Sequence, residues 1–207
     1  MKHTFLARAR VPALALVVAV SLAACTGGGS DDGSGHDMAG MSGASPSTED
    51  PSGSASEAGA ADVMFAQMMV PHHEQAIEMA DALLAKDGTS PELVDLAERI
   101  KAAQGPEIET LTGWLEAWNA EPAADGHAGM GDGMMTADDM QALDDAQGAD
   151  AERLFLEQMV VHHEGAVEMA QAEVSDGEDA DAVAMAQAIV DTQTDEIQQM
   201  KELLASR

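Results

Sequence analysis

The chain has little of the side-chain chemistry on which most enzymes depend. Its 207 residues include one cysteine, Cys25, together with two tryptophans, three phenylalanines and no tyrosine. A single cysteine excludes an internal disulfide and any metal site built from several thiolates. The sequence also lacks a phosphate-binding glycine loop and a recognisable nucleophile with its base. We therefore predict a binding protein and not an enzyme.

Basic residues are scarce as well. The chain has 9 Lys and Arg against 38 Asp and Glu, which gives a formal net charge of -29. This charge makes nucleic acid and anionic lipid surfaces poor partners, whereas cations are concentrated near the protein. Most of the carboxylates are expected to form a solvated surface that keeps the protein in solution.

The N-terminal segment has the order of an export signal. Three basic residues within the first ten precede an apolar run over residues 11–20, and the segment ends in Leu-Ala-Ala-Cys at Cys25. The run is shorter than the roughly 20 residues of a membrane-spanning helix. The ending resembles the lipobox of bacterial lipoproteins, which implies a signal peptide over residues 1–24 and a lipidated Cys25 at an extracytoplasmic membrane surface. An ordinary cleaved signal peptide is the alternative.

The remainder of the chain divides into a tether and a helical region. Residues 25–60 are rich in Gly, Ser, Ala, Asp and Pro, a composition that predicts a disordered tether. From residue 61 onward the apolar positions recur at helical spacing and no segment alternates as a strand does. Helices are predicted over residues 62–86, 91–119, 137–146, 149–174 and 179–205.

The predicted helices form two similar hairpins. The segment MMVPHHEQAIEMA at residues 68–80 returns as QMVVHHEGAVEMA at residues 158–170. The following helices repeat as well, because Ile-x3-Gln-x2-Glu-Ile occurs at residues 100–108 and again at residues 189–197. We predict an all-α, ferritin-like four-helix bundle made of two duplicated hairpins, with repeat 1 at 61–119, a link at 120–135 and repeat 2 at 136–207.

The helical phase separates the two histidines of each copy. On a wheel of about 100° per residue, His73 and His163 fall on the apolar inner face, while His72 and His162 fall at its edge. That edge is expected to form a groove beside methionines. The methionines on it are Met64, Met68, Met79 and Met169, whereas Met69 and Met159 fall on the inner face, where core packing explains them.

Polar residues of the other two long helices are expected to meet the inner histidines. Glu107 and Glu196 fall on inner faces, and each needs a partner because an isolated buried carboxylate is costly. Inward His73 and His163 are the expected partners. Gln104 and Gln193 complete a polar cluster that either fixes the register of the helices or binds a metal in the interior.

Methionine and histidine also occur together in two glycine-rich segments, HDMAGM and GHAGMGDGMM. Their residues are His36, Met38, Met41, His127, Met130, Met134 and Met135. Core packing does not account for methionine in exposed flexible chain, whereas capture of a soft metal by mobile arms does. Thioether and imidazole ligands without thiolate suit Cu(I) or Ag(I), and imidazole also holds Cu(II) or Zn(II).

The pattern Met-x2-His-His-x2-Ala-x2-Met-Ala, followed by Ile-x3-Gln-x2-Glu-Ile, resembles the secreted bacterial family called domain of unknown function 305. The resemblance covers residues 62–115 and 135–204. It implies a ferritin-like bundle and, through copper-binding periplasmic members, binding of Cu(I) or Ag(I) and a part in copper tolerance. The implied ligands are His72, His73, Met69, Met79, His162, His163, Met159 and Met169, with Glu107 and Glu196 in support.

The sequence therefore favours a lipid-anchored copper or silver buffer or chaperone in the cell envelope. Its expected partners are metal ions, the membrane through Cys25, and a second copy of the chain or another envelope metal-handling protein. A ferritin-like iron or manganese redox protein is one alternative, although the first and third long helices offer histidine without an inward glutamate. An envelope interaction module with a purely structural His and Glu cluster is another.

Overall fold

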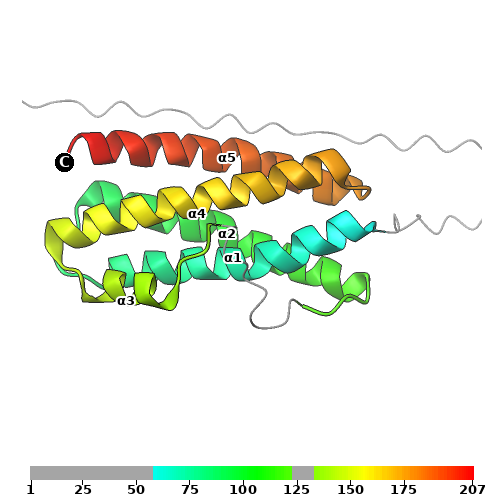
Figure 1. Cartoon of the computed structure of the whole chain (residues 1–207), viewed down its shortest axis with the longest axis horizontal. Helices are drawn as coiled ribbons and strands as arrows, with labels where there is room; N and C mark the ends of the chain where they lie inside the picture. The colour runs from blue at the N-terminus through cyan, green and yellow to red at the C-terminus, as the bar shows by residue number, and fades with distance from the viewer. Residues whose placement is uncertain (1–57, 123–132) are drawn as a thin grey trace, which may run out of the picture. The chain divides into compact units, whose positions relative to one another are not determined.

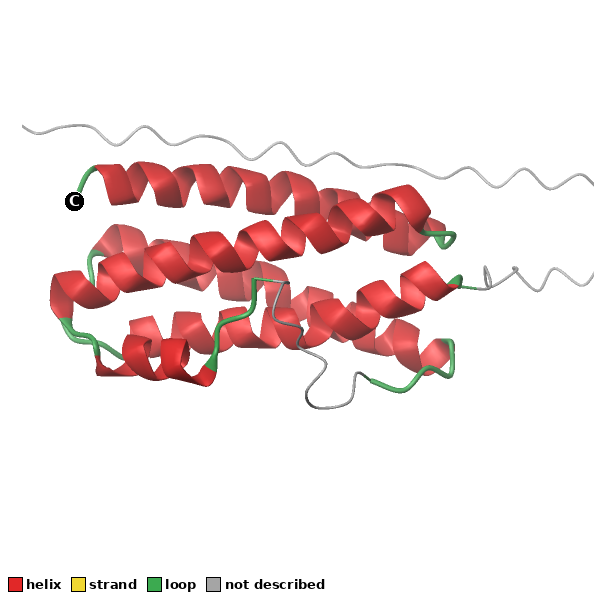
Figure 2. Ribbon diagram, viewed as in Figure 1, coloured by secondary structure: helices red, strands yellow, loops and turns green. Residues whose placement is uncertain are grey.

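The computed structural model describes residues 58–122 and 133–207, so the expected signal peptide, Cys25 and almost all of the tether lie outside the described residues. The described chain contains five helices and no strand (Figures 1 and 2). They are α1 (Ala60–Leu84), α2 (Pro91–Ala117), α3 (Ala137–Asp145), α4 (Gly148–Asp176) and α5 (Ala180–Ala205). The all-α prediction is confirmed, and the predicted helix bounds differ from the observed ones by at most two residues.

Two antiparallel hairpins form the body of the structure. Helix α1 packs on α2, α4 packs on α5, and the contact between α1 and α4 joins the two hairpins (Figure 1). The short helix α3 packs on both α1 and α4. Among the described helices, none combines the length and the apolar content that a membrane span needs. The ferritin-like character of the arrangement stays a prediction.

Side chains at the helix starts supply the hydrogen-bond acceptors that free backbone N–H groups need. The Thr136 hydroxyl accepts from the Asp139 N–H at the start of α3, and the Asp139 carboxylate accepts in return from the Thr136 N–H. Asp179 caps α5 in the same way, because its carboxylate accepts from the N–H groups of Asp181 and Ala182. Such caps fix where each helix begins.

Asp62 ties the start of α1 to the turn between α4 and α5. Its buried carboxylate accepts from the N–H of Gly59 at 2.5 Å and from the N–H groups of Glu178 and Asp179 at 3.0 Å each. Burial raises the pKa of Asp62, but these hydrogen bonds outweigh burial and hold the pKa below its ordinary value. The two hairpins are thus joined at this end by an ionised side chain.

Two apolar clusters fill the interior, one toward each end of the helices. The first cluster lies between the C-terminal half of α1 and the N-terminal half of α4, and includes Leu83, Leu96, Phe155 and Met200. The second lies between the N-terminal half of α1 and the C-terminal half of α4, and includes Phe65, Leu111, Ala170 and Ile189. On every long helix, the residues of the two clusters are separated by a short stretch at mid-length that belongs to neither.

Candidate metal centre

Polar side chains occupy the interval between the two apolar clusters. Each long helix contributes two of them. On each helix, these two positions lie between the residues that belong to the first apolar cluster and those that belong to the second. We call this set the polar layer: His72 and His73 of α1, Gln104 and Glu107 of α2, His162 and His163 of α4, and Gln193 and Glu196 of α5. All four histidines are at most 1% exposed. Burial of this kind needs compensating partners, because a buried polar atom without one is costly.

Two of the histidines are paired with glutamates, as the helical phase predicted. The Nε2 atom of His73 lies 2.7 Å from Glu107 Oε2, and the Nε2 atom of His163 lies 2.9 Å from Glu196 Oε2. The glutamate side chains are 24% and 16% exposed, so they lie at the rim of the helical body while the imidazoles lie inside it. A carboxylate that accepts from Nε2–H fixes the tautomer in which Nδ1 keeps its lone pair.

The freed nitrogens of these two histidines have no partner in the protein. Nδ1 of His73 and Nδ1 of His163 are both buried, and neither has a hydrogen-bond partner. An imidazole that donates one N–H to a carboxylate and directs the other nitrogen inward is the usual arrangement of a metal-ligating histidine. The pair of His–Glu contacts therefore leaves two buried Nδ1 atoms in the layer without a protein partner.

His72 and His162 face each other in the interior. Their ring centroids are 3.7 Å apart, with 37° between the ring planes. The prediction that these two histidines lie at the edge of the buried face, opposite a methionine groove, is wrong, because they are 1% and 0% exposed. The physical reason is that α1 packs on two neighbours: His73 points to α2, and His72 points to α4. A wheel drawn for one helix does not show the second contact.

His162 has the least favourable surroundings of the four. Both of its ring nitrogens are buried without a hydrogen-bond partner. Burial, and after it the neighbouring His72, lowers the pKa of His162 well below its ordinary value. The imidazole is therefore neutral at physiological pH, which is the form that binds metal ions. A native protein retains such an unsatisfied group at a cost in stability, and a bound ligand is one way to offset it.

The methionines of the duplicated motif divide into buried and half-buried ones. Met69 and Met159 are fully buried in the apolar clusters, as expected from packing. Met79 was expected on the groove stripe beside His72, but it is also fully buried, in the first cluster. It is covered for the same reason as His72, since two neighbouring helices widen the buried face of α1. Met68 and Met169 remain half-buried between α1 and α4.

The end of the link is held in place beside the polar layer. The Met135 N–H donates to Gln75 Oε1 at 2.7 Å, and Gln75 Nε2 donates to the Met135 carbonyl at 2.9 Å. The Met135 side chain packs on the first apolar cluster, and Met134 lies in a surface pocket along α4. The expectation that these two methionines belong to a mobile arm is therefore wrong, because α1 fixes the backbone. His36, Met38, Met41, His127 and Met130 lie outside the described residues.

A difference between the two copies explains this docking, and sequence reasoning missed it. Gln75 of the first copy aligns with Gly165 of the second. Gly133 has φ +76°, and a Cβ there would lie 2.5 Å from the Val161 carbonyl oxygen and 3.1 Å from Gly165 Cα. One copy thus supplies the amide that binds the link, and the other supplies the space into which the link fits. The position at which the repeats differ was the available signal.

The donor set fits some metal ions better than others. Among residues 58–122 and 133–207, no three His, Cys, Asp or Glu side chains are grouped as a ready-made metal site. The potential ligand atoms are imidazole nitrogens in a layer bordered by the thioethers of Met69 and Met159. Nitrogen and thioether donors in small number suit soft monovalent ions, whereas magnesium, calcium and manganese prefer several oxygen ligands.

Solved structures of similar proteins cover nearly the same part of the chain. A DUF305 protein from Streptomyces coelicolor that is assigned as secreted is 32% identical, with a TM-score of 0.66, and the match covers 70% of this chain and 93% of that one. A DUF305 fragment from Deinococcus radiodurans is 30% identical, with a TM-score of 0.65, over 72% of this chain and 99% of that one. CopM in its Cu(I)-bound form is 33% identical, with a TM-score of 0.60, over 70% of this chain and 96% of that one.

The metal state of CopM varies among these structures. It has been solved with Cu(I), with Cu(II) and with silver. No curated protein matches the chain. The family model described as Domain of unknown function (DUF305) matches residues 62–204, which include both copies of the motif and the whole polar layer. The chain therefore belongs to the DUF305 family.

Proposed function

We propose that the polar layer binds a soft monovalent metal ion, Cu(I) or Ag(I), through buried imidazole nitrogens. The observation that carries the proposal is that His73, His162 and His163 all hold buried ring nitrogens without a protein partner. A purely structural layer would leave these atoms unsatisfied. A metal ion satisfies them, and neutral imidazole is the form in which it does so.

Two histidines of the layer are oriented as metal ligands. Glu107 and Glu196 accept from Nε2 of His73 and His163, so that Nδ1 of each imidazole points inward. His72 and His162 lie next to them, with the His162 and His163 rings 6.4 Å apart. Met69 and Met159 precede the His pairs by one helical turn and place thioethers at the border of the layer. The whole ligand set requires no charged ligand in the interior.

The bound ion would be carried and not used in catalysis. CopM, which is 33% identical, is known in copper-bound and silver-bound forms, and this supports the choice of ion. The secreted relative supports export of the chain, and the Leu-Ala-Ala-Cys sequence supports attachment through lipidated Cys25. We assign the chain as a four-helix bundle that buffers or chaperones copper or silver in the cell envelope and so contributes to copper tolerance.

Titration with metal under reducing, anaerobic conditions tests this assignment. Cu(I) is added against a competing chromophoric chelator, and bound Ag(I) is measured in parallel. We expect the His73→Ala/His163→Ala variant to bind at least tenfold more weakly than the unaltered protein, because each deletion removes an inward lone pair. Met200→Leu is the matched control, since Met200 is equally buried but lies in the first apolar cluster.

Circular dichroism shows whether each variant is folded before it is titrated. Unchanged stoichiometry and affinity in a folded His73→Ala/His163→Ala protein would remove the polar layer as the metal site. The iron or manganese alternative makes a different prediction, namely that elemental analysis of the protein isolated from its own envelope finds one of those metals and no copper. Zn(II) and Cu(II) serve as further titrants, for which we expect weaker binding in the layer.

A further inference from the structure

We propose a second soft-metal site, formed by the thioethers of Met64, Met68 and Met169 in an open groove between α1 and α4. This site is separate from the polar layer and does not depend on metal binding there. Its ligand class is a monovalent soft cation, for which Ag(I) is the experimental probe.

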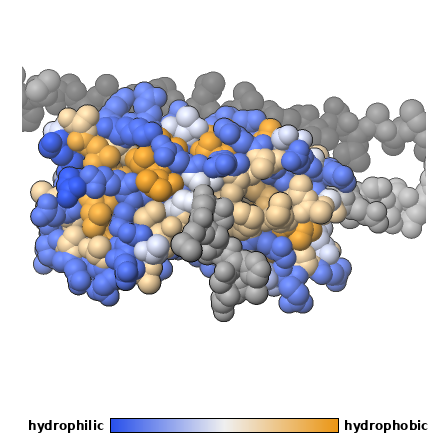
Figure 3. Space-filling view, viewed as in Figure 1, coloured by the Kyte–Doolittle hydropathy of each residue, from blue (hydrophilic) through white to orange (hydrophobic). Residues whose placement is uncertain are grey.

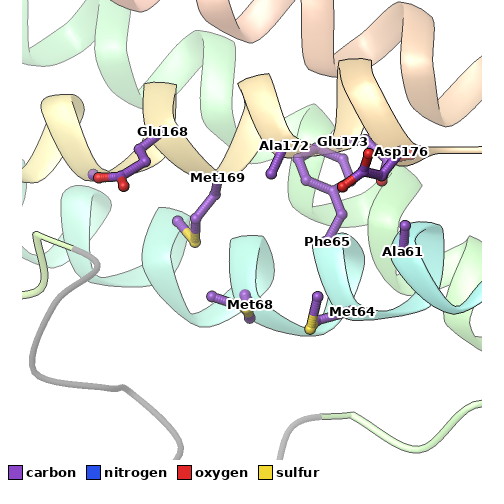
Figure 4. Close-up of a pocket in the computed structure, with 10 residues that line it drawn as sticks. Ala61, Met64, Phe65, Met68, Glu168, Met169, Ala172, Glu173 and Asp176 are labelled. Atoms are coloured by element: carbon purple, nitrogen blue, oxygen red, sulfur yellow. The ribbon is translucent and has the colours of Figure 1, made fainter.

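The groove is a defined cavity that two helices line. It has a volume of about 290 Å³. Figure 4 shows Met64 and Met68 on α1 and Met169 on α4, on opposite sides of the groove. Met64 and Met68 are four residues apart, so both side chains lie on the same face of α1. The lining residues are Ala61, Met64, Phe65, Met68, Gly165, Glu168, Met169, Ala172, Glu173 and Asp176.

The exposure of these methionines is not explained by core packing. Met64 is 57% exposed, and Met68 and Met169 are half-buried, whereas Met69, Met79, Met159 and Met200 are completely buried. Burying an apolar side chain is favourable, so a surface position has no packing reason to prefer methionine over a polar residue. Exposure does leave the sulfur atoms accessible. A thioether is a soft, uncharged ligand that selects Cu(I) or Ag(I) over hard cations.

Two exposed carboxylates at the edge of the groove favour a cation in it. Glu168 and Asp176 are exposed at its edge. No Lys or Arg lines the groove. In a chain with a net charge of -29, this arrangement raises the local concentration of cations, while the ligand atoms themselves stay neutral.

The side chains that line the groove also favour an ion over an apolar peptide as its occupant. Figure 3 shows pale apolar surface on this face of the molecule, bordered by hydrophilic residues. Apart from Phe65, every large apolar side chain that lines the groove is a methionine, and the remaining apolar ones are alanines. Apolar docking alone would be served equally well by leucine, which has no sulfur. Leucine is therefore the substitution that distinguishes the two occupants.

Methionine-methyl NMR with added Ag(I) tests the proposal on the whole purified protein. Each ¹³C-labelled methyl resonance is assigned by a single Met→Leu substitution. We expect the resonances of Met64, Met68 and Met169 to shift together as Ag(I) is added. The Met64→Leu/Met68→Leu/Met169→Leu variant should bind one equivalent of Ag(I) fewer, with unchanged circular dichroism. Met185→Leu is the control, because Met185 is a half-buried methionine of α5 outside the groove.

The same titration in a His72→Ala/His162→Ala background separates this site from the polar layer. We expect the three groove resonances to shift there as they do in the unaltered protein, even if the layer no longer binds. The groove site is wrong if the three resonances do not move, or if the triple leucine variant retains the full number of Ag(I) equivalents. Loss of Ag(I) from the layer alone bears on the proposed function and leaves the groove site standing.

Discussion

His72 and His162 lie ninety residues apart in the sequence and face each other with ring centroids 3.7 Å apart in the interior. They are the same position of the two motif copies, so a local pseudo-twofold axis passes between them, as it does when equivalent residues meet in a symmetric dimer. The flanking contacts of His73 with Glu107 and of His163 with Glu196 obey the same symmetry. Duplication of one hairpin has thereby built a centre that a single hairpin does not contain.

Replacing His162 with leucine should not destabilise the metal-free protein. Both ring nitrogens of His162 are buried without partners, and removal of an unsatisfied polar group in favour of an apolar one is neutral or stabilising. We expect the free energy of unfolding in urea to stay the same or rise by up to about 2 kcal/mol. Phe155→Ala is the comparison, a core truncation expected to cost about 3–5 kcal/mol. A comparable loss in His162→Leu would show that the layer is satisfied without metal.

Removing the Glu107 carboxylate should weaken metal binding without abolishing it. The carboxylate orients His73, and loss of such a supporting partner typically costs about 10–100-fold in metal affinity. Glu107→Ala also leaves Nε2 of His73 buried and unpaired, which should lower the free energy of unfolding by about 1–3 kcal/mol. Competition with a Cu(I) chelator measures the affinity. Glu109→Ala, an exposed neighbour on α2, is the control, and equal affinities in the two variants would contradict the orienting role.

Glu173 should make the protein less stable as the pH rises. Burial, and then the adjacent Asp62 carboxylate, raises the pKa of Glu173 from 4.5 to about 8. The folded state therefore keeps a proton that the unfolded chain releases, so the contribution of Glu173 is full below pH 4.5 and is lost progressively as the pH rises toward 8. Glu173→Gln imitates the protonated form and should remove this part of the pH dependence.

Urea unfolding at a series of pH values between about 5 and 9, in buffers of constant salt concentration, measures how the free energy of unfolding depends on pH. Glu168→Gln is the matched control, because Glu168 is an exposed glutamate of the same helix. We expect Glu173→Gln to gain stability over the unaltered protein as the pH increases, and the control to run parallel to the unaltered protein. Parallel curves for all three proteins would show that Glu173 does not hold the proton.

Gly133→Ala should release the end of the link from α4. Gly133 has φ +76°, and an added Cβ would lie 2.5 Å from the Val161 carbonyl oxygen, which belongs to the backbone and cannot move aside. Gly88→Ala is a matched control, because Gly88 has φ +80° but nothing within 4 Å of its added Cβ. Both variants carry the strain of a positive φ, roughly 1 kcal/mol. Only Gly133→Ala adds a clash.

We expect the free energy of unfolding to fall by about 1–2 kcal/mol more in Gly133→Ala than in Gly88→Ala. Limited proteolysis should also cleave the link of Gly133→Ala faster, because the hydrogen bonds between Gln75 and Met135 are lost. Equal stabilities and equal cleavage rates would mean that the docked link contributes nothing to the fold.

Periodicity and spacing were enough to predict part of the centre. The helix bounds and the pairing of His73 with Glu107 follow from the apolar face of each helix and from the cost of an isolated buried carboxylate. The position of His72 does not follow, because it depends on which second helix covers α1, and a single-helix wheel carries no such information. For the same reason, Met79 was expected in the groove, although it is fully buried. Met135 was misjudged because a glycine-rich composition predicts flexibility, while two hydrogen bonds to Gln75 decide the outcome.

The most direct test of the central claim is a crystal structure of the protein loaded with Ag(I), with the silver located by anomalous scattering. We expect a silver peak inside the polar layer, within bonding distance of imidazole nitrogens of His72, His73, His162 or His163. Silver found at surface thioethers or carboxylates, with none in the layer of a fully loaded crystal, would contradict it.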